Sequence, residues 1–85
     1  MGYEIEYKPA ADRQLEKLAK SAQKRIIKRI EELAENPRPR GAKKLEGMDD
    51  LWRIRVGQYR VLYTIEDDVL MVLVVRVADR KDVYR

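Results

Sequence analysis

The sequence contains no cysteine and no histidine among its 85 residues. Without cysteine, the fold has neither a disulfide nor a thiolate metal site to support it. Without histidine, the chain lacks the usual metal ligand and the usual general base near neutral pH. These two absences exclude zinc fingers, Ser-His-Asp triads and Cys-His nucleophilic sites.

Long apolar segments are also missing. The longest apolar run, residues 69–75, is far too short to cross a bilayer, which takes roughly 20 residues. Residues 1–7 alternate acidic and apolar side chains and are unlike a secretory signal. We therefore expect one small domain over residues 1–85, with a modest core, acting in the cytoplasm.

The charge balance is only slightly basic, with 19 basic and 15 acidic residues and a net charge of +4. The local distribution is more informative than the total. Residues 36–45 hold no acidic residue and four cations, which are Arg38, Arg40, Lys43 and Lys44. This cluster indicates a polyanionic partner.

A short strand and two helices are predicted in the first half of the chain. Residues 3–7 alternate as a half-buried strand, and Pro9 suits the first turn of a helix. Ser21 can cap a second helix with an apolar stripe formed by Ile26, Ile27, Ile30, Leu33 and Ala34. The cations of residues 24–29 face outward, and we interpret them as solvated surface with Glu32 as a neighbour. A membrane partner is not expected, because this helix lacks interfacial aromatic residues.

The second half predicts strands. Residues 43–45 suit a short strand, residues 51–65 a hairpin, and the apolar residues 69–77 a central strand buried on both faces. The predicted fold class is α+β. It has an antiparallel sheet of four to five strands and an N-terminal helical hairpin packed on one face.

The hairpin around Gly57-Gln58 is the most informative segment. This pair suits the two loop residues of a type II′ turn, which places Arg55 opposite Arg60 and Arg53 opposite Leu62. Alternation then puts one set of side chains on a single face, as expected of core residues. The set consists of Trp52, Ile54, Val56, Tyr59, Val61 and Tyr63.

The other face of the hairpin carries three arginines, Arg53, Arg55 and Arg60, which we call the basic trio. Like charges directly opposite each other destabilise a strand pair, so their clustering indicates that an anion lies over this face. Phosphate suits the planar fork of guanidinium donors. A solvated face neutralised by the chain's own acidic side chains is the alternative.

Four segments, residues 44–47, 51–56, 57–63 and 76–84, carry motifs that resemble the RelE/ParE toxin superfamily, most closely its RelE branch. The resemblance covers essentially the whole chain and implies a RelE-like fold. It also implies the toxin of a type II toxin–antitoxin system. RelE-like toxins are ribosome-dependent endoribonucleases (mRNA interferases) that cut messenger RNA in the decoding site.

The resemblance assigns roles to individual residues. Arg53 and Arg55 stand at the strand positions of catalytic lysines in the family, and Arg60 matches the arginine of its Tyr-Arg-Val element. Arg80 stands where the family's general acid sits, and Tyr84 where a tyrosine stacks on a base. The basic trio thus follows from the hairpin geometry and from the resemblance alike.

A second group of residues is expected to bind the ribosome and its RNA through phosphate, with affinity that falls as salt rises. The group consists of Arg38, Arg40, Lys43, Lys44 and Lys81.

The implied reaction is attack of a ribose 2′-hydroxyl on the adjacent phosphorus, which leaves a cyclic phosphate and a 5′-hydroxyl and needs no metal or cofactor. Arginine in place of lysine at positions 53 and 55 weakens the case for a general base there, because a guanidinium keeps its proton. The base is left open among Tyr84, a lysine with a lowered pKa, and the ribosome with solvent. The chain stops one residue after Tyr84, so a C-terminal helix that regulates the site is not expected.

Two other functions compete with the ribonuclease. A ParE-like toxin inhibits DNA gyrase and cuts no RNA, and a non-catalytic homologue only binds. The basic trio and Tyr84 argue against the gyrase inhibitor, whereas the missing lysines favour the binding module. Tyr84 has a structural interpretation too, as a cover for the edge of the core. All three functions imply a cognate antitoxin, a segment of which folds on the basic face as it binds.

Overall fold

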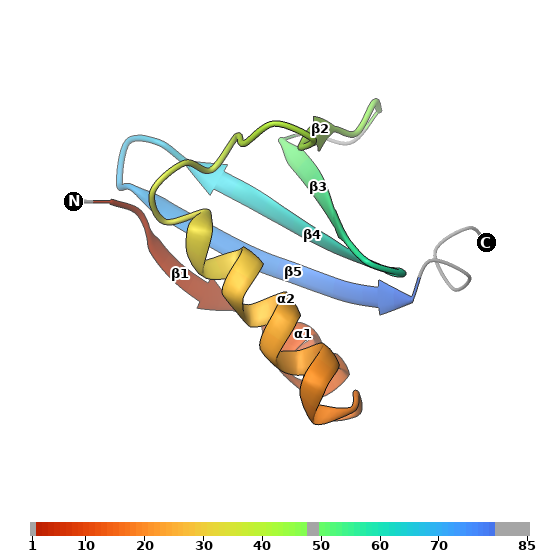
Figure 1. The fold of residues 1–85 in the computed structure, drawn as a ribbon. Coiled ribbons are helices and arrows are strands. Elements are labelled where there is room, and N and C mark those ends of the chain that lie inside the picture. The colour runs from red at the N-terminus through yellow and green to blue at the C-terminus, as the bar shows by residue number, and fades with distance from the viewer. Residues whose placement is uncertain (1, 48–49, 80–85) are drawn as a thin grey trace.

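The computed structural model describes residues 2–47 and 50–79 and confirms the α+β class. Two helices precede most of a five-stranded sheet, as Figure 1 shows. In chain order the elements are β1 (Glu4–Tyr7), α1 (Pro9–Glu16), α2 (Lys20–Glu32), β2 (Lys43–Lys44), β3 (Leu51–Val56), β4 (Tyr59–Glu66) and β5 (Met71–Asp79).

The sheet is mixed, with the strand order β1-β5-β4-β3-β2. Strands β2 to β5 form an antiparallel meander, whereas β1 pairs parallel with β5, from Glu4 beside Met71 to Tyr7 beside Val74. This parallel pair departs from the expected all-antiparallel sheet. Parallel neighbours need a long connection, and here the whole middle of the chain separates the two strands.

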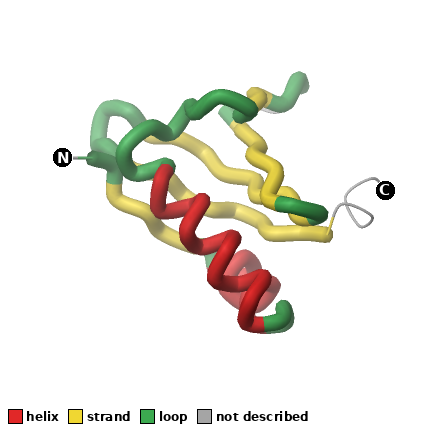
Figure 2. Tube along the Cα trace, in the orientation of Figure 1, coloured by secondary structure: helices red, strands yellow, loops and turns green. Residues whose placement is uncertain are grey.

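The helices cover one face of the sheet (Figure 2). Pro9 lies in the first turn of α1, as predicted, because its fixed backbone angle suits that position. The predicted cap of α2 is wrong. The helix starts at Lys20, with Ala19 at the N-cap and no side-chain cap, so Ser21 lies inside the first turn. The core joins both helices to the sheet, and its largest fully buried members include Ile26, Ile30, Val61 and Tyr63.

Strand β5 is covered on one face only, which corrects the expectation of burial on both faces. Val72 and Val74 are buried against the helices, while Met71 and Leu73 on the opposite face are half-buried. The prediction also began too early, because Val69 lies in the preceding turn with 62% of its surface exposed. In the described part of the chain, no helix is long and apolar enough to cross a membrane.

Candidate RNA-binding site

The β3–β4 hairpin has the register that the sequence predicts. Val56 pairs with Tyr59, Arg55 with Arg60, and Arg53 with Leu62. Gly57 has φ +61° and takes the first loop position, where a type II′ turn needs a positive φ. The side chain of Gln58 donates a 2.8 Å hydrogen bond to Asp79 Oδ2, which ties the turn to the end of β5.

The two faces of this hairpin differ as predicted. Tyr63 is fully buried beneath the helices, and Trp52 and Tyr59 pack against the same core. The basic trio lies on the opposite face, which the helices leave uncovered and which we call the open face. Arg60, on a central strand, is only 7% exposed, Arg53 is half-buried and Arg55 is exposed. The site therefore combines one buried arginine, Arg60, with two arginines that solvent can reach.

The open face carries two further cations. Lys43 pairs with Arg53 across β2 and β3, and Arg76 pairs with Leu62 across β4 and β5. Directly paired residues point to the same side of a sheet, so both cations join the trio. Together with the trio they make a group of five: Lys43, Arg53, Arg55, Arg60 and Arg76.

Sequence reasoning missed Arg76 because of an irregularity in β5. Strict alternation from Val72 and Val74 puts Arg76 in the core. The register between β4 and β5 shifts at Leu62/Tyr63, so that Val77 becomes the next buried residue and Arg76 turns to the open face. Such a bulge reverses the inward and outward positions that follow it. The only sign of the bulge in the sequence is that strict alternation would bury a charged residue, Arg76, in the core.

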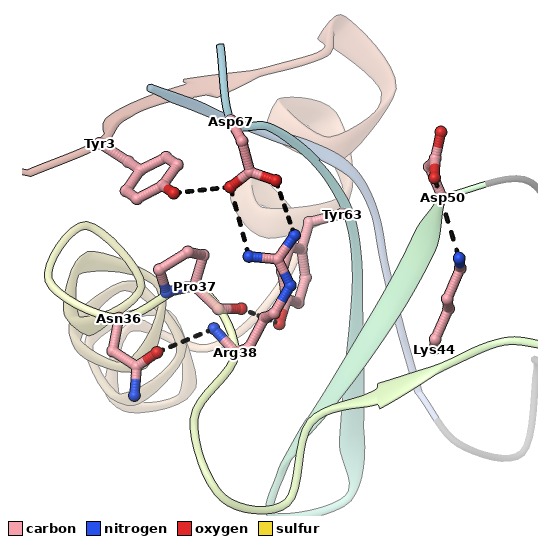
Figure 3. Close-up of polar contacts among 8 residues, drawn as sticks. All are labelled: Tyr3, Asn36, Pro37, Arg38, Lys44, Asp50, Tyr63 and Asp67. Carbon is pink, nitrogen blue, oxygen red and sulfur yellow. Dashed lines mark hydrogen bonds and ion pairs between the residues drawn. The ribbon is translucent and has the colours of Figure 1, made fainter. Parts of the chain in front are cut away.

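Arg38, a predicted ribosome contact, has an intramolecular partner in the structure (Figure 3). Its guanidinium donates two hydrogen bonds to the Asp67 carboxylate, from Nη2 to Oδ2 at 2.8 Å and from Nη1 to Oδ1 at 3.3 Å. It also lies over the Trp52 ring, 5.3 Å from the centroid. The Tyr3 hydroxyl donates to Asp67 Oδ1 at 2.7 Å. The arrangement joins the segment after α2 to the β4–β5 turn and to Tyr3, the residue before β1.

Hydrogen bonding and burial shift several pKa values around this contact. The pKa of Asp67 is lowered, chiefly because Arg38 and then Tyr3 donate to its carboxylate. The same hydrogen bonds with Asp67 raise the pKa of Arg38 and of Tyr3. Burial raises the pKa of Tyr63 to about 12, and its hydroxyl donates a 2.7 Å hydrogen bond to the carbonyl of Pro37.

Replacing Asp67 by asparagine is expected to lower the melting temperature at pH 7. Because the folded state holds the pKa of Asp67 below its ordinary value near 4, the charged form stabilises the fold above that pH. The stabilisation is lost as the pH falls through the lowered value. Melting curves of both proteins should therefore converge in acid.

Asp68→Asn is the matched control, because the same charge is removed one residue away at an exposed position. An equal loss of stability in Asp67→Asn and Asp68→Asn at pH 7 would contradict the role given to the Arg38–Asp67 contact.

The structure places the other predicted ribosome contacts that it describes, apart from Lys43, away from the open-face group. Arg40 is exposed in the segment before β2. Lys44 faces away from Lys43, with its Nζ 3.9 Å from Asp50 Oδ1. Arg80, Lys81 and Tyr84 lie outside the described residues. Of the predicted residues that the structure describes, the trio and Lys43 are brought together, whereas Arg38, Arg40 and Lys44 are not part of the open-face group.

The chemistry of the open face is that of an anion-binding surface. Its arginines and lysine donate hydrogen bonds and positive charge, and a guanidinium cannot accept a proton. In residues 2–47 and 50–79, no group of three or more acidic side chains could hold a metal ion. The described part of the site can bind, orient and stabilise a phosphate, and a phosphorane is the anion on which such donors act most strongly.

The sequence matches a family model described as the ParE toxin of the type II toxin–antitoxin system parDE, over residues 5–84. A putative RelE-like toxin protein of Escherichia coli is 32% identical over 88 aligned residues, covering 99% of this chain and 92% of that protein. The mRNA interferase toxin RelE of Escherichia coli K12 is 31% identical with the same coverage.

Solved structures agree with these sequence matches. A chain in the crystal structure of the archaeal RelE–RelB complex from Pyrococcus horikoshii OT3 superposes with a TM-score of 0.83 at 28% identity. The match covers 94% of this chain and 97% of that one. The similarity therefore covers nearly all of the chain.

Proposed function

Because the chain belongs to the RelE/ParE toxin superfamily, as a RelE-like toxin of the type II toxin–antitoxin class, we propose that it is a ribosome-dependent endoribonuclease. Its substrate is messenger RNA in the decoding site of a translating ribosome. The place of action is then the cytoplasm.

The observation that carries the proposal is the cluster of five cations on the open face. Three of them, the basic trio, stand where the RelE resemblance assigns catalytic residues, and two more come from neighbouring strands. Together these five side chains supply the positive charge and the hydrogen-bond donors that bind phosphate. A gyrase inhibitor that only binds protein has no need of such a group, although the matching family model bears the name of the ParE branch.

In the proposed mechanism, the ribose 2′-hydroxyl attacks the adjacent phosphorus and the P–O5′ bond breaks. The products are a 2′,3′-cyclic phosphate and a 5′-hydroxyl. Arg60, held rigidly in β4, donates to the non-bridging oxygens as their charge grows, and Arg53 and Arg55 hold the flanking backbone. The proton of the 2′-hydroxyl passes to a base, which is left open among Tyr84, a lysine, and the ribosome with solvent. Arg80 gives a proton to the leaving O5′, and Tyr84 stacks on a base, as the resemblance implies.

Two partners follow from this function. The ribosome presents single-stranded message in a fixed geometry, and Arg40, Lys43 and Lys44 are proposed to contact its RNA. A cognate antitoxin is the second partner, and the solved RelE–RelB complex of P. horikoshii supports it. An antitoxin segment with acidic side chains complements the basic open face, and its binding there would block the site.

Controlled expression in bacteria tests the class of function. The proposal predicts that protein synthesis, followed by incorporation of labelled amino acid, stops within minutes while plasmid supercoiling stays normal. Relaxed plasmid and continuing synthesis would instead identify the gyrase inhibitor. Unchanged growth with the folded protein present would indicate the non-catalytic module.

A further inference from the structure

A basic pocket lies at the outer edge of β3, beside the open face. Its volume is about 350 Å³, at the small end of the range of ligand sites. Six residues line it: Arg29, Gly41, Lys43, Arg53, Ile54 and Arg55. Four of the six are cations and none is acidic, so the pocket is built for an anion.

The sheet register explains how three of these cations converge. Lys43 pairs directly with Arg53, and Arg55 follows Arg53 on the same side of β3. The pairing of β2 with β3 does not extend before Lys43, because the chain turns away from β3 at Gly41, which has φ +94°. A side chain added at Gly41 would meet nothing within 4 Å. The pocket thus opens to solvent where β2 stops covering the edge of β3.

The fourth cation, Arg29, comes from α2, whose charges the sequence suggested were merely solvated. It is half-buried, whereas its neighbour Lys28 is exposed. Its Nε lies 3.4 Å from Glu32 Oε1, but the two side chains keep 39% and 59% of their surface exposed, and ion pairs in contact with solvent are weak. Arg29 therefore loses little interaction energy if it exchanges its contact with Glu32 for an anion in the pocket.

A second arginine of α2 follows the same edge. If Gly57 carried a Cβ atom, that atom would lie 3.4 Å from Nη2 of Arg25. Arg25 therefore lies over the β3–β4 turn, one helical turn before Arg29. The two arginines of α2 run beside β3, from the hairpin turn to the pocket.

We propose that Arg29, with Lys43 and the β3 arginines, forms a second phosphate site that holds the RNA backbone next to the scissile phosphate. The inference rests on the proposed function and extends it. Arg53 and Arg55 belong both to the pocket and to the trio, so an anion in the pocket lies beside an anion on the trio. A nucleic-acid strand supplies consecutive phosphates at such neighbouring positions, and each suits a guanidinium fork.

The first test is binding of a short 2′-O-methyl RNA oligonucleotide, which this chemistry cannot cleave, by fluorescence anisotropy over a range of salt. Arg29→Gln is expected to weaken binding about 10-fold, the loss of one hydrogen-bonded charge contact. It should also reduce the salt slope by about 0.7, the value for one phosphate of a single strand. Lys28→Gln, the matched control, should change the affinity less than about 2-fold.

The second test separates message from ribosomal RNA as the source of the phosphate. For each variant, the ribosome concentration that gives half-maximal cleavage is measured on programmed ribosomes. A weaker oligonucleotide complex with an unchanged ribosome requirement places the message in the pocket. A raised ribosome requirement for Arg29→Gln alone would place ribosomal RNA there, and it would overturn the assignment of the pocket to the backbone next to the scissile phosphate.

Equal behaviour of Arg29→Gln and Lys28→Gln in both tests would overturn the inference, because only general electrostatics would then be at work. A defect of Arg29→Gln confined to antitoxin binding would overturn it too and assign the pocket to an acidic peptide. The oligonucleotide test remains readable if the protein cuts no message, so a failure of the proposed function is distinguishable. Thermal unfolding of each variant confirms that the fold is intact.

Discussion

Arg60→Gln is expected to lower the rate of message cleavage by about 100-fold or more, measured in single turnovers on saturating programmed ribosomes. Arg60 is 7% exposed on a central strand and lies directly opposite Arg55. Its side chain is therefore largely enclosed by its neighbours before the RNA arrives, which restricts its rotamers. A fixed donor aimed at the developing charge lowers the barrier without reorganisation, and glutamine supplies neither the charge nor the fork.

Two further variants make the Arg60 test specific. Arg60→Lys keeps the charge but not the fork and should fall between the wild type and Arg60→Gln. Arg13→Gln removes an exposed arginine from α1, far along the chain from the trio, and should leave cleavage unchanged. A folded Arg60→Gln protein that cuts within about 3-fold of the wild-type rate would remove Arg60 from the chemistry.

Tyr63→Ala is expected to reduce the free energy of unfolding by about 4 kcal/mol, the typical cost of deleting a buried ring. Tyr63 is fully buried, and its ring joins β4 to the helices. Small domains have only about 5–15 kcal/mol in total, so this single change should remove a large fraction of the stability. Urea titration followed by circular dichroism measures the loss.

Tyr63→Phe separates the ring of this tyrosine from its hydroxyl. It keeps the packing but leaves the carbonyl of Pro37 without its 2.7 Å hydrogen bond, at a cost of about 1–2 kcal/mol. Burial raises the pKa of Tyr63 to about 12, so the hydroxyl stabilises the fold up to about pH 10. That stabilisation is lost between about pH 10 and 12, and Tyr63→Phe should lack this alkaline transition. A phenylalanine variant that is fully stable yet inactive would contradict the purely structural role.

The trio could be predicted from sequence because its geometry is local. A two-residue turn at Gly57-Gln58 fixes the register of both strands, and alternation then assigns every side chain to a face. No contact with the rest of the chain is needed. The start of α1 could be predicted from Pro9 for the same reason, because it depends only on neighbouring residues.

The missed features depend on contacts between distant segments. Arg76 reaches the open face only through the bulge between β4 and β5. Arg38 meets Asp67, which lies 29 residues further along the chain. Arg29 lines a pocket that exists because α2 packs beside the edge of β3. A periodic pattern describes one element at a time, so it predicted solvated surface for α2 and gave no sign that Arg38, a predicted ribosome contact, has a partner within the chain.

The same limit applies to the sheet. The meander from β2 to β5 follows from short turns, whereas the parallel pairing of β1 with β5 joins the two ends of the described chain. Sequence patterns favour neighbours along the chain, and an all-antiparallel sheet is the simplest arrangement that they predict.

Mapping the RNA ends that the wild-type protein produces tests the central claim most directly. The message is translated by purified ribosomes stalled at a known codon, and both ends of any product are determined, the 5′ ends by primer extension. The claim predicts a cut within the codon in the decoding site, with a cyclic phosphate on one product and a 5′-hydroxyl on the other, and no cut in free message. An intact message on ribosomes that have bound the folded protein would contradict it.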